Sequence, residues 1–325
     1  ERNELMLKNI FSGSSFKVDD FLASVVVFLV ALPLCMGIAI ASGMPPAAGL
    51  ITGIVGGIVV GTLSGSPLQV SGPAAGLSVI VFDQVARFGV ESFAIIVLLA
   101  GLLQAIAAGV GLGQWFRAVS PAVIHGMLAG IGILIFSSQF HVMLEGRPAG
   151  SGLENFLGMG SRLKDLVYTT NLQAVSAGFV GIVTISVLMA WNAYKPARLK
   201  AVPGALIGVV AGTAVATLWK LPVRLVEIPA NLMDTVKWPS FQLLTSVEGL
   251  LSVIPAALAL AFIASAESLL CASAVDQMHS GPKTKYNKEL FAQGVGNAIC
   301  GMLGALPMTG VIVRSAANVE AGARS

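Results

Sequence analysis

Residues 61–72 read GTLSGSPLQVSG, and residues 301–310 read GMLGALPMTG. Three residues of the first stretch recur in the second at a constant offset of 240 positions, and Gly72 matches Gly310 once two residues are dropped. The three pairs are Gly61 with Gly301, Leu63 with Leu303, and Pro67 with Pro307. Each stretch leads from a glycine-rich apolar segment into a short one, so the pattern predicts two copies of one unit.

The composition around these stretches is typical of a protein embedded in a membrane. Hydrophobic residues make up 55% of the chain, charged residues make up 11%, and the mean hydropathy is +0.85, whereas soluble domains carry about 25% charged residues. About 20 apolar residues cross a bilayer as a helix. We therefore expect eight full-length spans and two half-length helices over 73–88 and 308–320. The full-length spans are 20–42, 44–64, 92–112, 120–140, 173–191, 202–219, 250–271 and 287–304.

The order of the segments predicts an all-α polytopic membrane protein built from inverted repeats. The first repeat covers 20–219 with seven segments, and the second begins in 250–325 with three. An odd number of segments turns the second copy over relative to the first, as is common in secondary transporters. A complete second copy needs about four more helices, so the chain is expected to be truncated within it.

Charges between the segments predict the orientation in the membrane. Loops 192–201 and 280–288 are rich in Lys and Arg, which favours the cytoplasm for both loops and for the N-terminal segment 1–19. Residues 220–249 then form an extracellular or periplasmic connection, and this loop and 141–172 are expected to carry short surface helices or extended pieces. We expect a multi-pass protein of the plasma membrane, in a bacterium the inner membrane. The net charge of +3 is too small and too scattered for nucleic acid binding.

The two half-length segments are the candidate walls of a binding site. A half-helix at membrane depth must line a cavity or lie inside protein, because lipid offers no partner for its free backbone groups. Residues 71–73 would open the first half-helix, and residues 307–310 would open the second. In an inverted repeat the two N-termini point at each other, and two facing helix N-termini form a concave site for an anion.

Arg314 and Glu267 are charged residues inside these apolar segments. Inserting a cation into the membrane at the position of Arg314 costs at least about 2.5 kcal/mol on insertion scales. We therefore assign Arg314 the role of attracting the anion. The alternatives are that Arg314 reaches the membrane interface or pairs with a carboxylate. Glu267 has three open roles: a partner of Arg314, a ligand of a coupling cation, or a proton acceptor. Pro33 predicts either irregular backbone at 34–37 beside the same cavity or an ordinary kink.

Other conspicuous residues are interpreted as packing groups. Glycines spaced by four let helices approach closely, and they occur at Gly53, Gly57 and Gly61 and again at Gly204, Gly208 and Gly212. Asn297 and Gln104 are expected to form interhelical hydrogen bonds. The cysteines and histidines do not have the spacing of metal ligands. We therefore assign packing or interface positions to all of them, namely Cys35, Cys271, Cys300, His125, His141 and His279.

The sequence contains no HExxH, GxSxG or GxxxxGK[ST] motif. We therefore expect no enzyme activity, no cofactor, no metal and no ATP-driven step. Gradients would drive any transport.

Three stretches make the chain resemble the SulP family of sulfate permeases and bicarbonate transporters, which is related to pendrin and prestin. They are LPLCMGIAIASGMPPAAGL at 32–50, VSGPAAGLSVIV at 70–81 and PMTGVIVRSAANVEAGAR at 307–324. The resemblance implies a core domain, here 20–112 with 250–325, and a gate domain, here 120–219. The core would move against the gate like an elevator, and complete members are commonly homodimers that carry a cytoplasmic STAS domain.

The resemblance also implies a set of substrate-binding residues. These would be the backbone of Ala74, Ala75 and Gly76, the backbone of Gly310, Val311, Ile312 and Val313, and the side chains of Arg314, Thr309, Leu34 and Cys35. Glu267 falls where the family often has an acidic residue implicated in sodium or proton coupling. Leu34 stands where many members have Gln, and Ala74 stands where sodium-coupled relatives have Thr, so sodium coupling is in doubt.

These residues favour secondary active transport of a small inorganic oxyanion, of the sulfate or bicarbonate type, as a proton-coupled symporter or an exchanging antiporter. The partners would be the anion and the lipid bilayer. Two alternatives remain open. One is a nucleobase-type carrier of the same fold, in which Arg314 would be out of place. The other is a prestin-like, voltage-responsive membrane protein with little transport.

Overall fold

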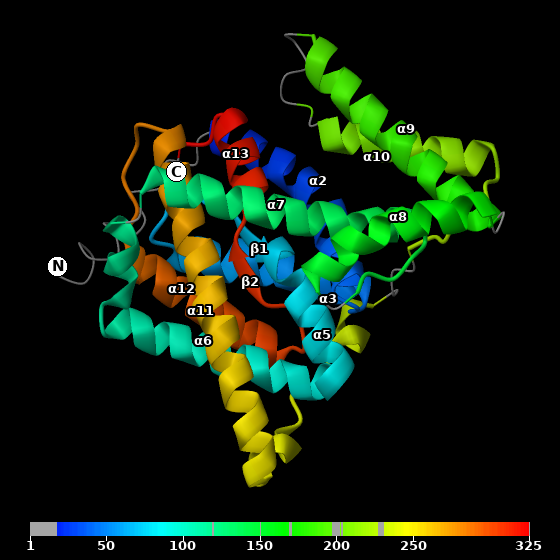
Figure 1. Ribbon diagram of the computed structural model, residues 1–325. Coiled ribbons are helices and arrows are strands. Elements are labelled where there is room, and N and C mark those ends of the chain that lie inside the picture. The colour runs from blue at the N-terminus through cyan, green and yellow to red at the C-terminus, as the bar shows by residue number, and fades with distance from the viewer. Residues whose placement is uncertain are drawn as a thin grey trace.

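The computed structural model of this protein describes residues 18–118, 120–149, 151–168, 171–196, 202, 204–226 and 231–324. The predicted N-terminal segment 1–19 falls almost wholly outside the described residues. Elsewhere the chain folds into a mainly helical body with one small sheet at its centre (Figure 1). The prediction of a helical membrane-protein fold is confirmed.

The long helices follow the predicted apolar segments. Local signals set several of their ends: Pro46 occupies the first helical position of one helix, and Asn171 and Ser246 accept backbone N–H groups at the starts of two others. The long helices are α2 (Val18–Ala41), α3 (Pro46–Val55), α6 (Val90–Gly109), α7 (Pro121–Met143), α9 (Leu172–Tyr194), α10 (Gly204–Leu218), α11 (Val247–Met278) and α12 (Tyr286–Met302).

Among the described residues, five helical stretches are long and apolar enough to cross a membrane. They are Asp19–Ala41, Pro46–Leu63, Val90–Gly109, Leu172–Tyr194 and Val247–Met278. Helices α10 and α12 are shorter than the full-length spans predicted over 202–219 and 287–304, with 15 and 17 residues. Helix α12 ends early because the chain turns at Leu303 toward the central sheet.

Helix α2 is continuous, so irregular backbone at 34–37, one of the two alternatives predicted at Pro33, is wrong. Helix α2 runs through Pro33 and through the stretch 34–37 without interruption. Proline is tolerated inside membrane helices where neighbouring groups satisfy the backbone that it frees. Leu34 and Cys35 therefore present helical side chains, and not irregular backbone, to their surroundings.

The two half-length segments each begin with a strand, which the sequence analysis did not predict. Strands β1 (Ser71–Pro73) and β2 (Met308–Gly310) pair antiparallel, with Gly72 opposite Thr309. Strand β1 leads through the 3₁₀ turn η2 (Ala75–Leu77) into α5 (Ser78–Phe88), and β2 leads into α13 (Ile312–Glu320). The echo between 61–72 and 301–310 thus corresponds to the same order of helix, turn, strand and short helix. The inverted seven-segment repeat itself stays a prediction.

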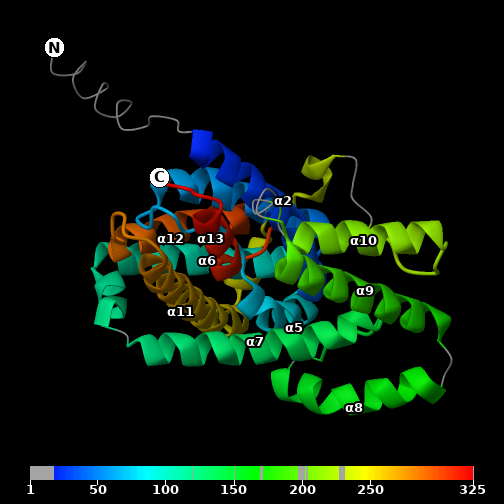
Figure 2. The same cartoon turned by 90° about the horizontal axis from the view of Figure 1, so that it is seen from above.

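The helices pack into two groups (Figures 1 and 2). Helices α6, α11 and α12 contact one another, α2 packs on α3 and α13, and the hydrophobic core lies among these elements around the two strands. Helices α9 and α10 pack chiefly on each other and lie to one side of this body. The division of the chain into a core domain and a gate domain remains a prediction.

Glycines mark the closest helix contacts, though not all of those predicted. A Cβ at Gly208 would lie 2.8 Å from the carbonyl oxygen of Thr184, so the predicted close approach of α10 to α9 is confirmed. A Cβ at Gly53 would lie 2.7 Å from Cys35 Sγ, whereas one at Gly57 would meet nothing within 4 Å. The prediction for Gly57 and Gly61 is wrong, because the π-helical turn η1 (Gly56–Val60) between α3 and α4 (Gly61–Leu63) rotates the following residues away from the contact face.

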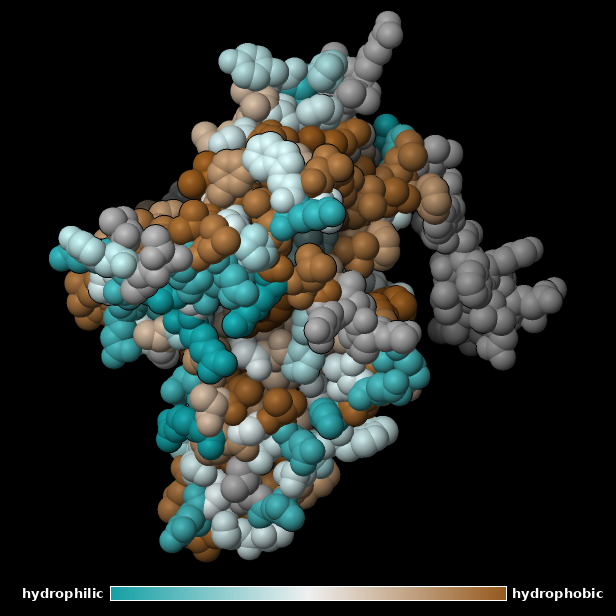
Figure 3. Space-filling model, turned by 90° about the vertical axis from the view of Figure 1, so that its right-hand side faces the viewer, coloured by the Kyte–Doolittle hydropathy of each residue, from teal (hydrophilic) through white to brown (hydrophobic). Residues whose placement is uncertain are grey.

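The two long connections carry short helices, as predicted. Helix α8 (Gly152–Tyr168) lies in 141–172, and the 3₁₀ turns η5 (Leu232–Thr235) and η6 (Phe241–Thr245) lie in 220–249. Figure 3 shows the side that carries α8, α9 and α10, where apolar side chains cover broad areas of the surface. Exposed apolar surface of this extent is expected of a protein whose solvent is lipid.

Candidate functional site

The central sheet brings the starts of the two short helices together. The N–H of Ala74 donates to the carbonyl of Pro307 (3.2 Å), and the N–H of Val311 donates to the carbonyl of Val70 (2.9 Å). These bonds extend the antiparallel β1–β2 pair at both ends, so β1 continues into residues 74–76 at the end beside Pro307, and β2 continues into residues 311–313 at the end beside Val70. The two groups of predicted backbone contacts therefore flank the same short sheet, one at each end, although about 235 positions separate them in the sequence.

Four of the predicted backbone donors are already engaged within the protein. The N–H groups of Ala74 and Val311 complete the sheet, and the N–H of Gly310 donates to Ser268 Oγ at 3.2 Å. The first N–H groups of a helix have no partner inside that helix. The N–H of Gly76 is engaged as well, because it donates to the Glu267 carboxylate. The groups that remain for a ligand are thus those at Ala75, Ile312 and Val313.

Arg314 is the most buried cation beside the sheet. The residue is 1% exposed, so it does not reach the membrane interface. Its guanidinium lies against Gly72, where a Cβ would overlap Nη1 and lie 3.1 Å from Cζ. Within the described residues, Nε and Nη2 have no hydrogen-bond partner, and no carboxylate lies within ion-pair distance. The predicted alternative in which Arg314 pairs with Glu267 is therefore wrong.

Glu267 lies against the 3₁₀ turn η2, which follows β1. A Cβ at Gly76 would lie 3.0 Å from Glu267 Oε1, and the carboxylate also lies beside Thr309. Thr309 is fully buried at the centre of β2. In the described part of the chain, Glu267 Oε2 and Thr309 Oγ1 are both buried without a hydrogen-bond partner. A carboxylate and a hydroxyl thus share one small region with unused hydrogen-bonding capacity.

Of the two predicted binding residues on helix α2, only Cys35 lies beside Arg314. Cys35 is buried beside Arg314 and packs against Gly53 of α3. Leu34 is only half-buried and supplies no polar group.

An open cleft of about 520 Å³ reaches the start of α13. Its walls come from α2, α9, α10 and α13, so it lies between the two helix groups. Ile312 and Val313 line it, and Lys195 and Glu320 are its charged residues. The cleft gives two of the predicted residues access from outside the helix body.

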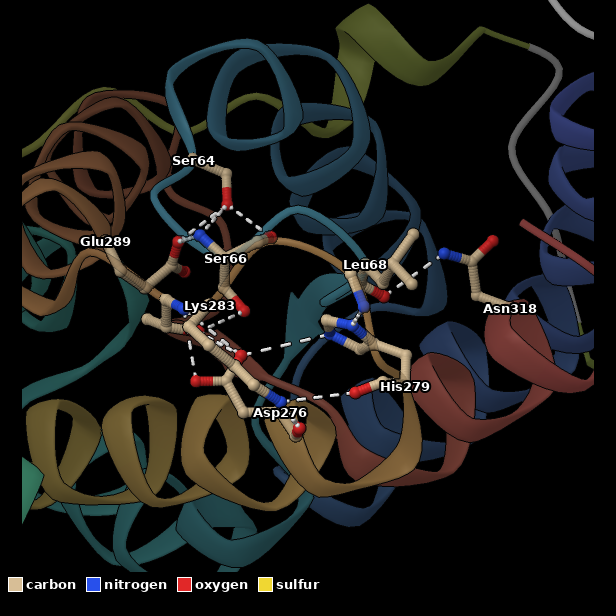
Figure 4. A network of polar contacts seen from close by, with 10 residues as sticks. Ser64, Ser66, Leu68, Asp276, His279, Lys283, Glu289 and Asn318 are labelled. Atoms are coloured by element: carbon tan, nitrogen blue, oxygen red, sulfur yellow. Dashed lines mark hydrogen bonds and ion pairs between the residues drawn. The ribbon is translucent and has the colours of Figure 1, made fainter. Parts of the chain in front are cut away.

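A buried carboxylate near β1 escaped the sequence analysis. Glu289, at the start of α12, is 0% exposed and accepts hydrogen bonds from the turn that precedes β1 (Figure 4). The donors are Ser64 Oγ (2.6 Å), Gly65 N (2.9 Å), Ser66 N (3.1 Å), Gln69 Nε2 (3.2 Å) and Gln293 Nε2 (2.8 Å). Gln293 Nε2 also donates to Ser71 Oγ at 2.7 Å, so this network holds the first strand.

The predicted interhelical hydrogen bonds are confirmed. Asn297 Nδ2 donates to Gln104 Oε1 (2.8 Å) and to the carbonyl of Met308 (3.1 Å), while the N–H of Met308 donates to Asn297 Oδ1 (2.7 Å). Asn297 thereby fixes the start of β2. His141 lies beside the carbonyl of Asn155 (2.8 Å), which fits its predicted packing role, whereas the side chain of His125 lies outside the described residues.

The sequence of the chain matches one family model and several known proteins over nearly its whole length. A model described as the sulfate permease family matches residues 18–325. The chain is 33% identical over 308 residues to YvdB of Bacillus subtilis (strain 168), covering 94% of this chain and 56% of that protein. It is 27% identical over 321 residues to the bicarbonate transporter BicA of Picosynechococcus sp. (strain ATCC 27264 / PCC 7002 / PR-6), covering 94% and 54%. The chain thus spans little more than half of these relatives.

A solved structure shares the fold. The transmembrane domain of a cyanobacterial bicarbonate transporter BicA superimposes with a TM-score of 0.77 at 25% sequence identity. The match covers 94% of this chain and 78% of that one.

Proposed function

The chain belongs to the sulfate permease family, a family of membrane transporters and not enzymes, and from this premise we propose that it is part of a secondary carrier for a small inorganic anion. The anion would be an oxyanion of the sulfate or bicarbonate type. It would bind where the β1–β2 pair meets the first residues of η2 and α13. Family members named for sulfate and for bicarbonate both resemble the chain, so neither anion is preferred.

The observation that carries the proposal is that Arg314 is buried and has no carboxylate within ion-pair distance among the described residues. A cation buried without a carboxylate loses its hydration and gains no compensating charge within the protein. An oxyanion beside Nε and Nη2 would supply that charge, and the free N–H groups of Ile312 and Val313 would complete its contacts. A neutral ring such as a nucleobase would leave the guanidinium uncompensated.

The cleft between the two helix groups supports an elevator-type mechanism, in which one group of helices carries the binding site past the other. In this proposal the body that carries β1 and β2 slides against α9 and α10, and the anion enters past Ile312 and Val313. The loops at 192–201 and 280–288 would face the cytoplasm, as would the N-terminus. The complete protein would work as a homodimer in the plasma membrane.

Glu267 is the proposed coupling site. Its carboxylate contacts the turn at Gly76 and the hydroxyl of Thr309, so it lies beside the proposed anion site without neutralising Arg314. Binding of a proton or cation at this carboxylate would change the charge next to the anion. The proposed cycle is therefore symport with a proton, or exchange of one anion for another.

The test is uptake of radiolabelled sulfate and bicarbonate by the complete protein reconstituted into liposomes, with the variant Arg314→Gln. A hydrogen bond to a charged group contributes about 1.5–3 kcal/mol, so we expect the apparent affinity for the anion to fall roughly 10- to 100-fold. The variant Arg314→Lys keeps the positive charge but loses the planar guanidinium. Its apparent affinity for the anion should lie between those of the wild type and Arg314→Gln. The matched control is Arg87→Gln, which removes an exposed arginine from the other short helix, α5.

Unchanged uptake by Arg314→Gln would remove this residue from the binding of the anion. Charge movement in a voltage-clamp recording without any flux of either anion would favour the prestin-like alternative over a carrier.

A further inference from the structure

The loop between α11 and α12 forms a basic hollow at one end of the helix body. The hollow encloses about 720 Å³, and its lining includes Lys283, Lys285, Lys288 and Gln114. Lys283 donates to the carbonyls of Asp276 and His279, so part of its charge is used in holding the loop. Lys285 and Lys288 are exposed and have no ion pair within the described residues. The free charge of the hollow therefore comes from these two lysines.

The acidic groups near the hollow are already satisfied. Asp276 is its one lining carboxylate and accepts hydrogen bonds from the N–H and the hydroxyl of Thr284. His279 Nε2 lies 3.8 Å from the same carboxylate. Glu289, which follows Lys288, points instead into the buried network with Ser64 and Ser66 (Figure 4). The hollow thus presents a surplus of positive charge to an incoming group.

An apolar groove of about 590 Å³ adjoins the basic hollow. It runs along the C-terminal half of α6 and the middle of α11, where Ile106, Leu258 and Phe262 are among its lining residues. The groove and the hollow share two elements. The 3₁₀ turn η3 (Leu112–Ala118) gives Trp115 to the groove and Gln114 to the hollow, and the first turns of α12 supply residues to both.

The junction lies where a membrane interface is expected. Trp115 is 77% exposed at this point, and tryptophan favours the level of the lipid headgroups. Helix α12 starts at the same place without a side-chain cap, and Tyr286, Asn287 and Lys288 at its positive dipole end line the hollow. Apolar surface, aromatic ring and positive charge thus follow one another along one path.

We propose that this path binds one anionic phospholipid. An acyl chain lies in the groove between α6 and α11, and the phosphate lies between Lys285, Lys288 and the N-terminus of α12. The charges between the segments predict the cytoplasmic side for the 280–288 loop, and the cytoplasmic leaflet is rich in anionic lipids. The inference rests on the membrane location of the chain and does not depend on the transported substrate.

The test is native mass spectrometry of the complete protein in detergent, titrated with phosphatidylglycerol or with phosphatidylcholine of the same acyl chains. We expect a retained phosphatidylglycerol adduct and little phosphatidylcholine adduct. Each lysine near an anionic headgroup contributes about fivefold in affinity, so the double variant Lys285→Gln/Lys288→Gln should lose roughly 25-fold. The matched control is Lys164→Gln/Lys220→Gln, which removes two exposed lysines from the side predicted to be outside.

A second variant separates the lipid from a free anion. Leu258→Trp places a larger side chain in the groove at an exposed position and should weaken the phosphatidylglycerol adduct. The thermal midpoint of this variant in pure phosphatidylcholine should be unchanged, which would show that the fold is intact. Equal adducts for the two lipids, full retention in the double lysine variant, or complete displacement by millimolar inorganic phosphate would each overturn the proposal. Full occlusion of the groove by other helices of the complete protein would appear as the first of these results.

Discussion

Arg314 and Gly72 face each other across the central sheet with no room for a methyl group between them. Gly72 is the middle residue of β1, and a Cβ there would overlap Nη1 of the guanidinium. The glycine is therefore required by the arginine and not by its own backbone, since Gly72 does not have a positive φ. The position of the buried Arg314 guanidinium depends on this absent side chain.

The first prediction follows from that contact. The variant Gly72→Ala should displace the Arg314 guanidinium and reduce anion uptake in liposomes roughly tenfold or more, because a charged hydrogen bond contributes about 1.5–3 kcal/mol. The matched control is Gly57→Ala, where a Cβ meets nothing within 4 Å. Equal uptake by the two variants would show that the arginine tolerates a different position.

The second prediction concerns coupling. Glu267→Gln keeps the size of the side chain but cannot ionise, so the proposed proton-binding step is lost. We expect that uptake no longer responds to an inward pH gradient, while exchange of labelled for unlabelled anion persists. Asp83→Asn on α5, an exposed carboxylate, serves as the control. An undiminished pH response in Glu267→Gln would move the coupling to another group.

The sequence made Arg314 and Glu267 detectable because a charge inside an apolar run is energetically unfavourable and therefore conspicuous. Their relationship was not detectable. Whether they pair depends on the direction of two side chains around the β1–β2 sheet, and each strand is only three residues long. Such strands carry no periodic pattern of their own, since they form only when two segments about 240 positions apart meet.

The third prediction addresses the buried network. Glu289→Ala would remove an acceptor from five donors and leave two of them, Gly65 N and Gln69 Nε2, without any acceptor among the described residues. Each such loss costs about 1–3 kcal/mol, so the variant should be strongly destabilised. Glu289→Gln retains one acceptor oxygen and should lower the thermal midpoint while leaving measurable protein. Glu248→Gln, at an exposed position in the first turn of α11, should leave the midpoint unchanged. A thermal midpoint of Glu289→Gln equal to that of the wild type would assign the network no role in stability.

Glu289 was overlooked because its sequence context resembles a loop. It follows Lys283, Lys285 and Lys288, so it reads as one more charge at a helix start. Its partners at Ser64, Gly65 and Ser66 lie more than 220 positions earlier. Gly57 shows the opposite error, since its spacing from Gly53 predicted a contact that one π-helical turn removed.

The fourth prediction compares a glycine inside the contact between α6 and α12 with a glycine outside it. A Cβ at Gly294 would lie 2.6 Å from the backbone N of Ala105, so Gly294→Ala should force the helices apart and destabilise the protein by about 1–3 kcal/mol. Gly109→Ala adds a methyl group where nothing lies within 4 Å and should be neutral or slightly stabilising. Unfolding in a denaturing detergent measures both. The same stability for both variants would contradict the close contact.

The pairing of β1 with β2 also sets an order of events during synthesis. Ser71 leaves the ribosome long before its partner Gly310, and at about 5–20 residues per second the delay is roughly 12–48 s. During that interval the turn at 64–69 has neither β2 nor Glu289 to hold it. A nascent chain halted before residue 308 would already contain helices α2 to α12 and yet have no place for an anion. The machinery that inserts such a chain into the membrane must therefore shelter an unfinished centre until β2 has been synthesised.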